Sequence, residues 1–147
     1  MKKTKLFIAT FLVSLLFIAC SNEDGDTTAP VISLISPQEG EELVIGNEKG
    51  VHLDMTLSDN EMLRSYKIEI HDNFDGHGHS KSETTGTTHF SFQKTWDISN
   101  QKNIKIHHHE IVIPQNATPG NYHLMVYCTD EAGNESYVAR NIVLIDN

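Results

Sequence analysis

The chain has 147 residues, with 20 acidic side chains, 11 basic side chains and nine histidines, and its formal net charge at pH 7 is −9. This length is typical of one domain that buries its apolar core without disulfide support. Without the first 19 residues, which hold Lys2, Lys3 and Lys5, 8 basic side chains stand against 20 acidic ones, and such an acidic chain is not expected to bind nucleic acid through its phosphates.

Residues 1–19 have the layout of a lipoprotein signal peptide. The three lysines precede an apolar run from Leu6 to Ala19 that is too short to span a bilayer as a helix. The end of this run, Phe-Ile-Ala-Cys, resembles the lipobox of bacterial lipoproteins, although leucine is more usual than Phe17 at its position. The resemblance implies that Cys20 is lipid-modified and becomes the new N-terminus. The alternative is an ordinary thiol after a cleaved signal peptide.

Residues 20–29 are expected to form a lipidated, flexible tether, because the stretch after Cys20 has three acidic and no large apolar side chains. This acidic stretch also resembles the signal that sends lipoproteins to the cell surface in Bacteroidetes-type bacteria. The expected location is therefore the outer membrane, with the domain on its periplasmic face or at the cell surface. Once Cys20 carries lipid, Cys128 is the remaining thiol, and its strand-like surroundings predict a buried, inert side chain.

From Pro30 onward, apolar residues recur with the two-residue period of strands. The segments with this pattern are 31–35, 51–57, 66–70, 90–98, 104–113, 122–126 and 136–145. Turn-forming residues separate them, and no segment shows a helical apolar stripe. Residues 30–147 are thus predicted to form an all-β, immunoglobulin/fibronectin-like sandwich of about seven antiparallel strands. The parity of the apolar residues changes between Ile106 and Ile111, which predicts a bulge or a change of sheet near residues 108–110.

Several segments carry a resemblance to a known family. TAPVISLISPQEGEEL and PGNYHLMVYCTDEAGNES are similar to bacterial immunoglobulin-like or fibronectin-type domains, in which Tyr122 would be the tyrosine-corner residue and residues 130–134 the last hairpin turn. With the lipobox, HDNFDGHGH and HHHEIVIP, the chain resembles an uncharacterised Bacteroidetes-type family, a domain of unknown function, of immunoglobulin-like, histidine-rich lipoproteins. This resemblance implies a fold and a location, but no activity.

Histidines provide the clearest chemical signal, because seven of the nine lie within 39 consecutive residues. Residues i and i+2 of an extended chain face the same side, so two such pairs can present imidazoles to one metal ion. Imidazole suits transition metals, with zinc as the first expectation and copper as the second. The expected ligands are His71, His77, His79, His107 and His109, with His89, His108 and His123 as additional candidates. His52, on the outer face of its strand, is expected to be dispensable.

In a seven-strand sandwich, His71, His89 and His123 are expected at the same end, where the segment 72–88 emerges. The polar residues also allow alternatives to a transition-metal site. Any single histidine can simply be solvated. The segment 71–82 lacks the first and last carboxylates of an EF-hand. A second calcium option would bring residues 59–61 to Asp130 and Glu131, although turn formation accounts for these residues more simply.

The sequence predicts no enzyme, because it lacks the G-x-S-x-G and H-E-x-x-H motifs. The remaining catalytic alternative is Glu110 acting as a general base on a metal-bound water. Two functions are therefore expected from the sequence. The first is a lipid-anchored protein that captures a transition metal and hands it to an outer-membrane receptor or transporter for uptake. The second is a non-catalytic adhesion or accessory module that contacts an outer-membrane protein or glycan.

Overall fold

The computed structural model of the chain describes residues 25–73 and 86–146. In these ranges the chain is all-β, and none of the described segments forms a long apolar helix that could span a bilayer. The strands are β1 (Val31–Ser36), β2 (Glu41–Val44), β3 (Val51–Asp72), β4 (Phe92–Ile111), β5 (Gly120–Asp130) and β6 (Glu135–Ile145).

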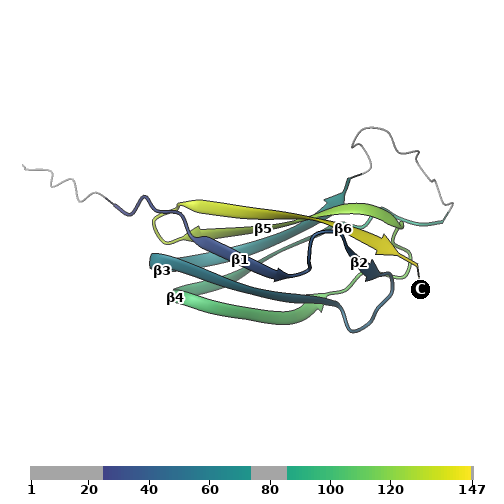
Figure 1. Ribbon diagram of the computed structural model, residues 1–147, viewed down its shortest axis with the longest axis horizontal. Helices are drawn as coiled ribbons and strands as arrows, with labels where there is room; N and C mark the ends of the chain where they lie inside the picture. The colour runs from purple at the N-terminus through teal and green to yellow at the C-terminus, as the bar shows by residue number, and fades with distance from the viewer. Residues whose placement is uncertain (1–24, 74–85, 147) are drawn as a thin grey trace, which may run out of the picture.

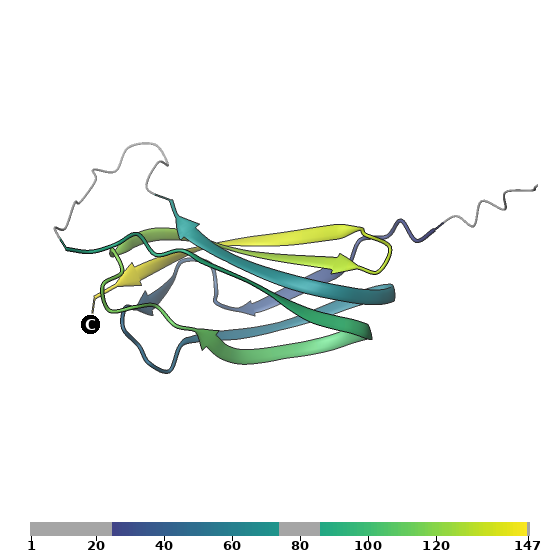
Figure 2. The same ribbon diagram turned by 180° about the vertical axis from the view of Figure 1, so that it is seen from behind.

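The two longest strands, β3 and β4, bend and contribute to both layers of the sandwich. They pair antiparallel from Val51 opposite Ile111 to Ile70 opposite Phe92, with register shifts between Ser58 and Leu63. On its other edge, β3 pairs with β1 before these shifts and with β5 after them. Figures 1 and 2 show both strands turning back at the end of the molecule where β1 begins.

The bends divide the strands into two layers. Layer 1 consists of β1 with residues 51–58 of β3 and 103–111 of β4. Layer 2 consists of residues 92–101 of β4, residues 63–72 of β3, β5, β6 and β2. The short strand β2 pairs parallel with the end of β6 and forms the edge of layer 2.

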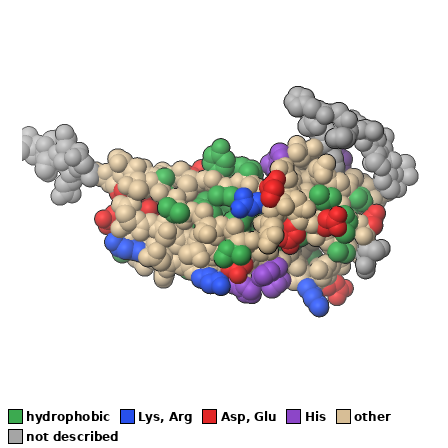
Figure 3. All heavy atoms as spheres, viewed as in Figure 1, with side chains coloured by type: hydrophobic (Ala, Val, Ile, Leu, Met, Phe, Trp, Pro, Cys, Tyr) green, Lys and Arg blue, Asp and Glu red, His purple; other side chains and the backbone are tan. Residues whose placement is uncertain are grey.

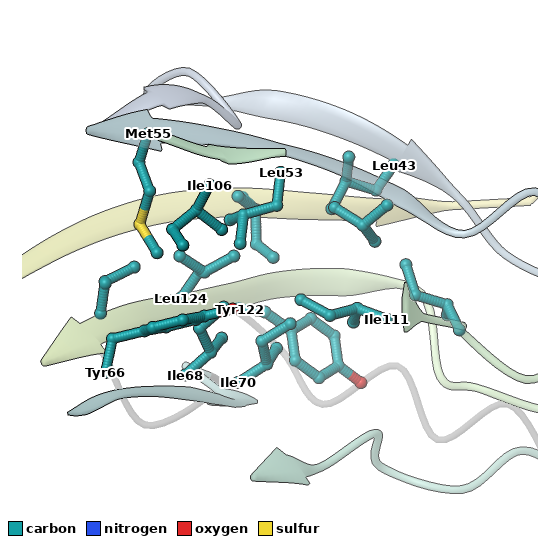
Figure 4. Close-up of a cluster of buried hydrophobic side chains, with 14 of the residues drawn as sticks. Leu43, Leu53, Met55, Tyr66, Ile68, Ile70, Ile106, Ile111, Tyr122 and Leu124 are labelled. Carbon is teal, nitrogen blue, oxygen red and sulfur yellow. The ribbon is translucent and has the colours of Figure 1, made fainter. Parts of the chain in front are cut away.

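Apolar side chains of the two layers meet between the sheets and form the core. Leu53 and Met55 from layer 1 face Tyr122 and Leu124 from layer 2, and all four are inaccessible to solvent (Figure 4). Because side chains alternate across a strand, burying residues 51, 53 and 55 turns residues 52 and 54 to the outer face of layer 1. The core thereby determines which polar residues of β3 reach the surface.

These strands confirm the predicted all-β sandwich. Each predicted segment overlaps an observed strand, but two pairs of segments merge into β3 and β4 because their hydrogen bonding continues through the bends. The strand β2 has only four residues and was not predicted from the sequence.

The predicted tyrosine corner is present. The Tyr122 hydroxyl donates a hydrogen bond to the Thr118 carbonyl (2.8 Å) and accepts one from the Phe90 amide (3.2 Å). In the predicted hairpin turn after β5, the Asn134 amide donates to Asp130 Oδ1 (2.8 Å). Both features fix the connections that lead into and out of β5.

The predicted irregularity in β4 is a bulge. Val51 pairs with Ile111, whereas Leu53 pairs with His108, so β4 has one more residue than β3 between these pairs. The extra residue changes the parity of the strand and lets both Ile106 and Ile111 face the core.

Candidate metal centre

Three histidines and an aspartate gather on the outer face of layer 1. His52 and Asp54 come from β3, and His107 and His109 come from β4. Asp54 is directly opposite His107 in the register of the two strands. We call these four residues the outer-face histidine cluster. Figure 3 shows histidine side chains in two separate places, one of which lies at the lower edge of the view beside basic and acidic side chains.

The cluster has the dimensions of a small metal site. Candidate ligand atoms of His52, Asp54 and His107 all lie within 4.8 Å of one another. The His52 ring centroid is 5.0 Å from that of His107 and 5.1 Å from that of His109, on which it stacks. A tetrahedral zinc ion with bonds of about 2.0–2.1 Å holds its ligands about 3.4 Å apart. Small rotations of these surface side chains would therefore bring two imidazoles and a carboxylate into coordination range.

Asp54 has one oxygen without a partner. Its side chain is 17% exposed, and Oδ2 lies 3.6 Å from the Lys105 ammonium. Oδ1 is buried and has no hydrogen-bond partner among the described residues. A buried carboxylate oxygen without a donor is unfavourable, so this atom fits a site whose cation would satisfy it.

The middle histidine of the triplet, His108, points away from this cluster. Its Nε2 lies 3.2 Å from the Tyr66 hydroxyl, and its Nδ1 is 3.3 Å from the Glu110 amide, which donates to it. The ring also packs at 5.1 Å from Trp96, and burial lowers the pKa of His108. Because both ring nitrogens already have partners, His108 does not fit its predicted role as an additional ligand.

Glu110 is also held by neighbouring side chains. Its carboxylate accepts hydrogen bonds from the Lys94 ammonium and from Trp96 Nε1, the latter at 3.2 Å. These hydrogen bonds lower the pKa of Glu110. The carboxylate thus lies in a pair with Lys94 beside Trp96 and is not one of the three candidate ligands that lie together.

A second group of histidines lies at the end of layer 2 where residue 73 is found. His71 and His123 are opposite each other on β3 and β5, with ring centroids 5.5 Å apart. His89 Nδ1 lies 2.5 Å from Oδ2 of Asp72. All three histidines therefore lie at this end of the sandwich, with His71 and His123 side by side and His89 beside Asp72. Within the described ranges, none of these histidines belongs to a group of three clustered ligand atoms.

The described members of the predicted ligand set lie on two different faces of the sandwich. His71 lies on the outer face of layer 2, whereas His107 and His109 lie on the outer face of layer 1, so these three do not share a pocket. The predicted ligands His77 and His79, like the predicted lipidation site Cys20, lie outside the described residues.

His52, expected to be dispensable, lies at the centre of the outer-face histidine cluster. The spacing of His107 and His109 correctly placed both on one face of a strand, but it did not identify the strand beside them. The register of β4 against β3 supplies His52 and Asp54 instead.

Comparison with known proteins adds a family and no activity. Residues 18–145 match the family described as "Domain of unknown function (DUF4625)". No curated protein matches the chain.

Proposed function

We propose that this chain, which belongs to that family of domains of unknown function, binds a transition metal ion through the outer-face histidine cluster. His52 and His107 would each provide an imidazole nitrogen and Asp54 a carboxylate oxygen, with His109 or water in the fourth position. Mixed nitrogen and oxygen donors suit zinc and, as the second choice, copper.

The observation that carries this proposal is the convergence of two imidazole nitrogens and one carboxylate oxygen at Asp54, a residue whose buried Oδ1 has no hydrogen-bond donor among the described residues. The site is also open, because His52, His107 and His109 are exposed. An exposed site with few protein ligands is suited to taking up and releasing an ion.

The proposal includes a location and a use for the metal. Lipidation of Cys20 would anchor the chain to the outer membrane through the residues that precede β1, with the domain on the periplasmic face or at the cell surface. The open site would then capture zinc or copper and transfer it to an outer-membrane receptor or transporter. No enzymatic step is part of this proposal.

Calorimetric titration of the full chain with zinc chloride at pH 7 tests the site. We expect His52→Ala and His107→Ala each to weaken binding by at least tenfold, because each removes one of few ligands. His123→Ala is the matched control, since it removes an outward-facing strand histidine from the other layer. Binding should also weaken sharply at pH 5, because protons compete for imidazole nitrogens. Equal loss in His52→Ala and His123→Ala would contradict the proposed site.

The second candidate function is a non-catalytic adhesion or accessory module. It is favoured by the free edge of β4, which pairs only with β3 among the described strands and could add a strand from an outer-membrane protein. Absence of zinc and copper binding in the titration would leave this alternative.

A further inference from the structure

Three aspartates meet at the end of the sandwich where β3 and β4 bend. Asp59 lies in the bend of β3, Asp130 is the last residue of β5, and Asp26 precedes β1. One carboxylate oxygen from each lies within 4.8 Å of the other two. Figure 1 shows the segment before β1 running beside the turn between β5 and β6. We call Asp26, Asp59 and Asp130 the three-aspartate cluster.

Hydrogen bonds fix each carboxylate of this cluster but leave two oxygens unsatisfied. Asn134 Nδ2 donates to Asp130 Oδ2 (2.7 Å) and to the Asp26 carbonyl (2.9 Å). Asn60 Nδ2 donates to Asp26 Oδ1 (3.0 Å), and the Glu61 amide donates to Asp59 Oδ2 (2.8 Å). Asp26 Oδ2 and Asp59 Oδ1 are fully buried and have no hydrogen-bond partner among the described residues.

The cluster also lacks a neutralising cation from the protein. Asp130 is only 1% exposed, and no ion pair within the described residues involves any of the three aspartates. Lys102 instead contacts the Asn60 carbonyl (2.9 Å) and Glu61 (3.9 Å). Turn formation accounts for the hydrogen bonds to Asp59 and Asp130, but it does not account for two buried oxygens without donors. Carboxylates held this close without a positive charge repel one another.

We propose that the three-aspartate cluster is a calcium site that fastens the segment before β1 to the end of the sandwich. All-oxygen donors prefer hard cations over the transition metals that bind imidazole. With bonds of about 2.3–2.6 Å, oxygens on opposite sides of a calcium ion are about 5 Å apart, which agrees with the observed spacing. The three carboxylates supply three to six ligands, and water completes the coordination.

Calcium binding at this position would couple the ion to the N-terminal segment. Asp26 is separated by 34 residues from Asn60 and by 108 residues from Asn134, yet it contacts both. An ion shared by Asp26, Asp59 and Asp130 would therefore join the segment before β1 to both layers. The orientation of the domain relative to any anchor that precedes residue 25 would then depend on whether calcium is bound.

Titration of the full chain with calcium chloride at pH 7, followed by calorimetry and thermal unfolding, tests this inference. We expect a dissociation constant of about 0.1–1 mM, which is typical of extracellular calcium modules. The unfolding midpoint should rise with calcium concentration, because the ion binds the folded state. Magnesium chloride should bind more weakly, since magnesium requires closer, octahedral ligands.

The variant Asp59→Asn separates binding from folding. It retains an acceptor for the Glu61 amide but removes one charge, so calcium affinity should fall at least tenfold. In EDTA the same variant should unfold at the same or a higher temperature than the original chain, because repulsion is relieved. Glu131→Gln, which changes an exposed acid next to Asp130, is the control and should bind calcium normally.

Three results would overturn the calcium site. These are the absence of both binding heat and a midpoint shift with calcium, normal binding by Asp59→Asn, and equal loss of binding in Glu131→Gln. The calcium site shares no residue with the proposed transition-metal site. The variants His52→Ala and His107→Ala should therefore keep full calcium affinity. If one of the two metal-binding proposals is refuted, the other can therefore still be tested.

Discussion

Lys105 competes with a metal ion for Asp54, so removing its charge should strengthen zinc binding. Its ammonium lies 3.6 Å from Asp54 Oδ2, and because the Lys105 side chain is 66% exposed, the pair resembles surface ion pairs, which contribute about 0.2–1 kcal/mol. Zinc bound to Asp54 would occupy the space near the ammonium. The lysine would have to give up the pair and move aside before the ion is coordinated.

The size of the effect follows from two contributions. The first is the ion pair that the lysine loses. The second is repulsion between the lysine and the divalent ion, which is about 1.4 kcal/mol at a distance of about 6 Å in water and is roughly halved by physiological salt. Together these give about 1–1.7 kcal/mol, so Lys105→Gln should bind zinc roughly 5- to 15-fold more tightly.

Competition titration with a colorimetric zinc chelator at low and physiological salt would measure this difference. Lys67→Gln is the matched control, because Lys67 forms an ion pair with Glu69 (2.8 Å) in layer 2 and its loss changes the net charge equally. The gain in Lys105→Gln should shrink as salt rises, and Lys67→Gln should bind zinc like the original chain. Unchanged or weaker binding by Lys105→Gln would refute the assignment of Asp54 as a ligand.

Two further predictions concern the fold. Tyr122→Phe leaves the buried Phe90 amide without its acceptor, so the free energy of unfolding in urea should fall by about 1–3 kcal/mol; an unchanged value would mean that the hydroxyl contributes nothing to the tyrosine corner. Cys128 is inaccessible to solvent, and burial raises the pKa of its thiol to about 12. It should therefore not react with a disulfide reagent at pH 8 until denaturant is added, and rapid reaction of the folded chain would contradict this burial.

The strands could be predicted from the sequence because their signal is local. Alternating apolar residues identify the segments of β1, β3, β4, β5 and β6, and the parity change after Ile106 identifies the bulge. The four residues of β2 are too few to show a period, and their partner is the end of β6, about one hundred residues later. Continuous hydrogen bonding through the bends depends on the paired strands and has no signature in either segment alone.

The candidate metal site could be predicted only in part. The spacing of His107 and His109 shows that they share a face, whereas the identity of the opposing residues depends on the register between β3 and β4. The alternation of His52 and Asp54 with buried neighbours was a usable signal, because it places a ligand pair on the outer face of a strand. Histidine density along the chain was the weaker guide, since neighbours such as His107 and His108 face different sides.

The three-aspartate cluster shows the same dependence on the fold. Asp59 and Asp130 lie in turns that the sequence identifies, and their meeting was one of the open calcium options. Asp26 lies in the stretch that the sequence predicts to be a flexible tether, so its contacts with Asn60 and Asn134 were not expected. Only the assembled layers bring these segments together.

A crystal structure of the zinc-loaded chain, with anomalous data collected on both sides of the zinc absorption edge, tests the central claim most directly. We expect an anomalous peak on the outer face of layer 1, about 2 Å from nitrogens of His52 and His107 and from an oxygen of Asp54. A peak at His71 and His123 instead, or none at the outer-face histidine cluster in a zinc-saturated crystal, would contradict the proposed site.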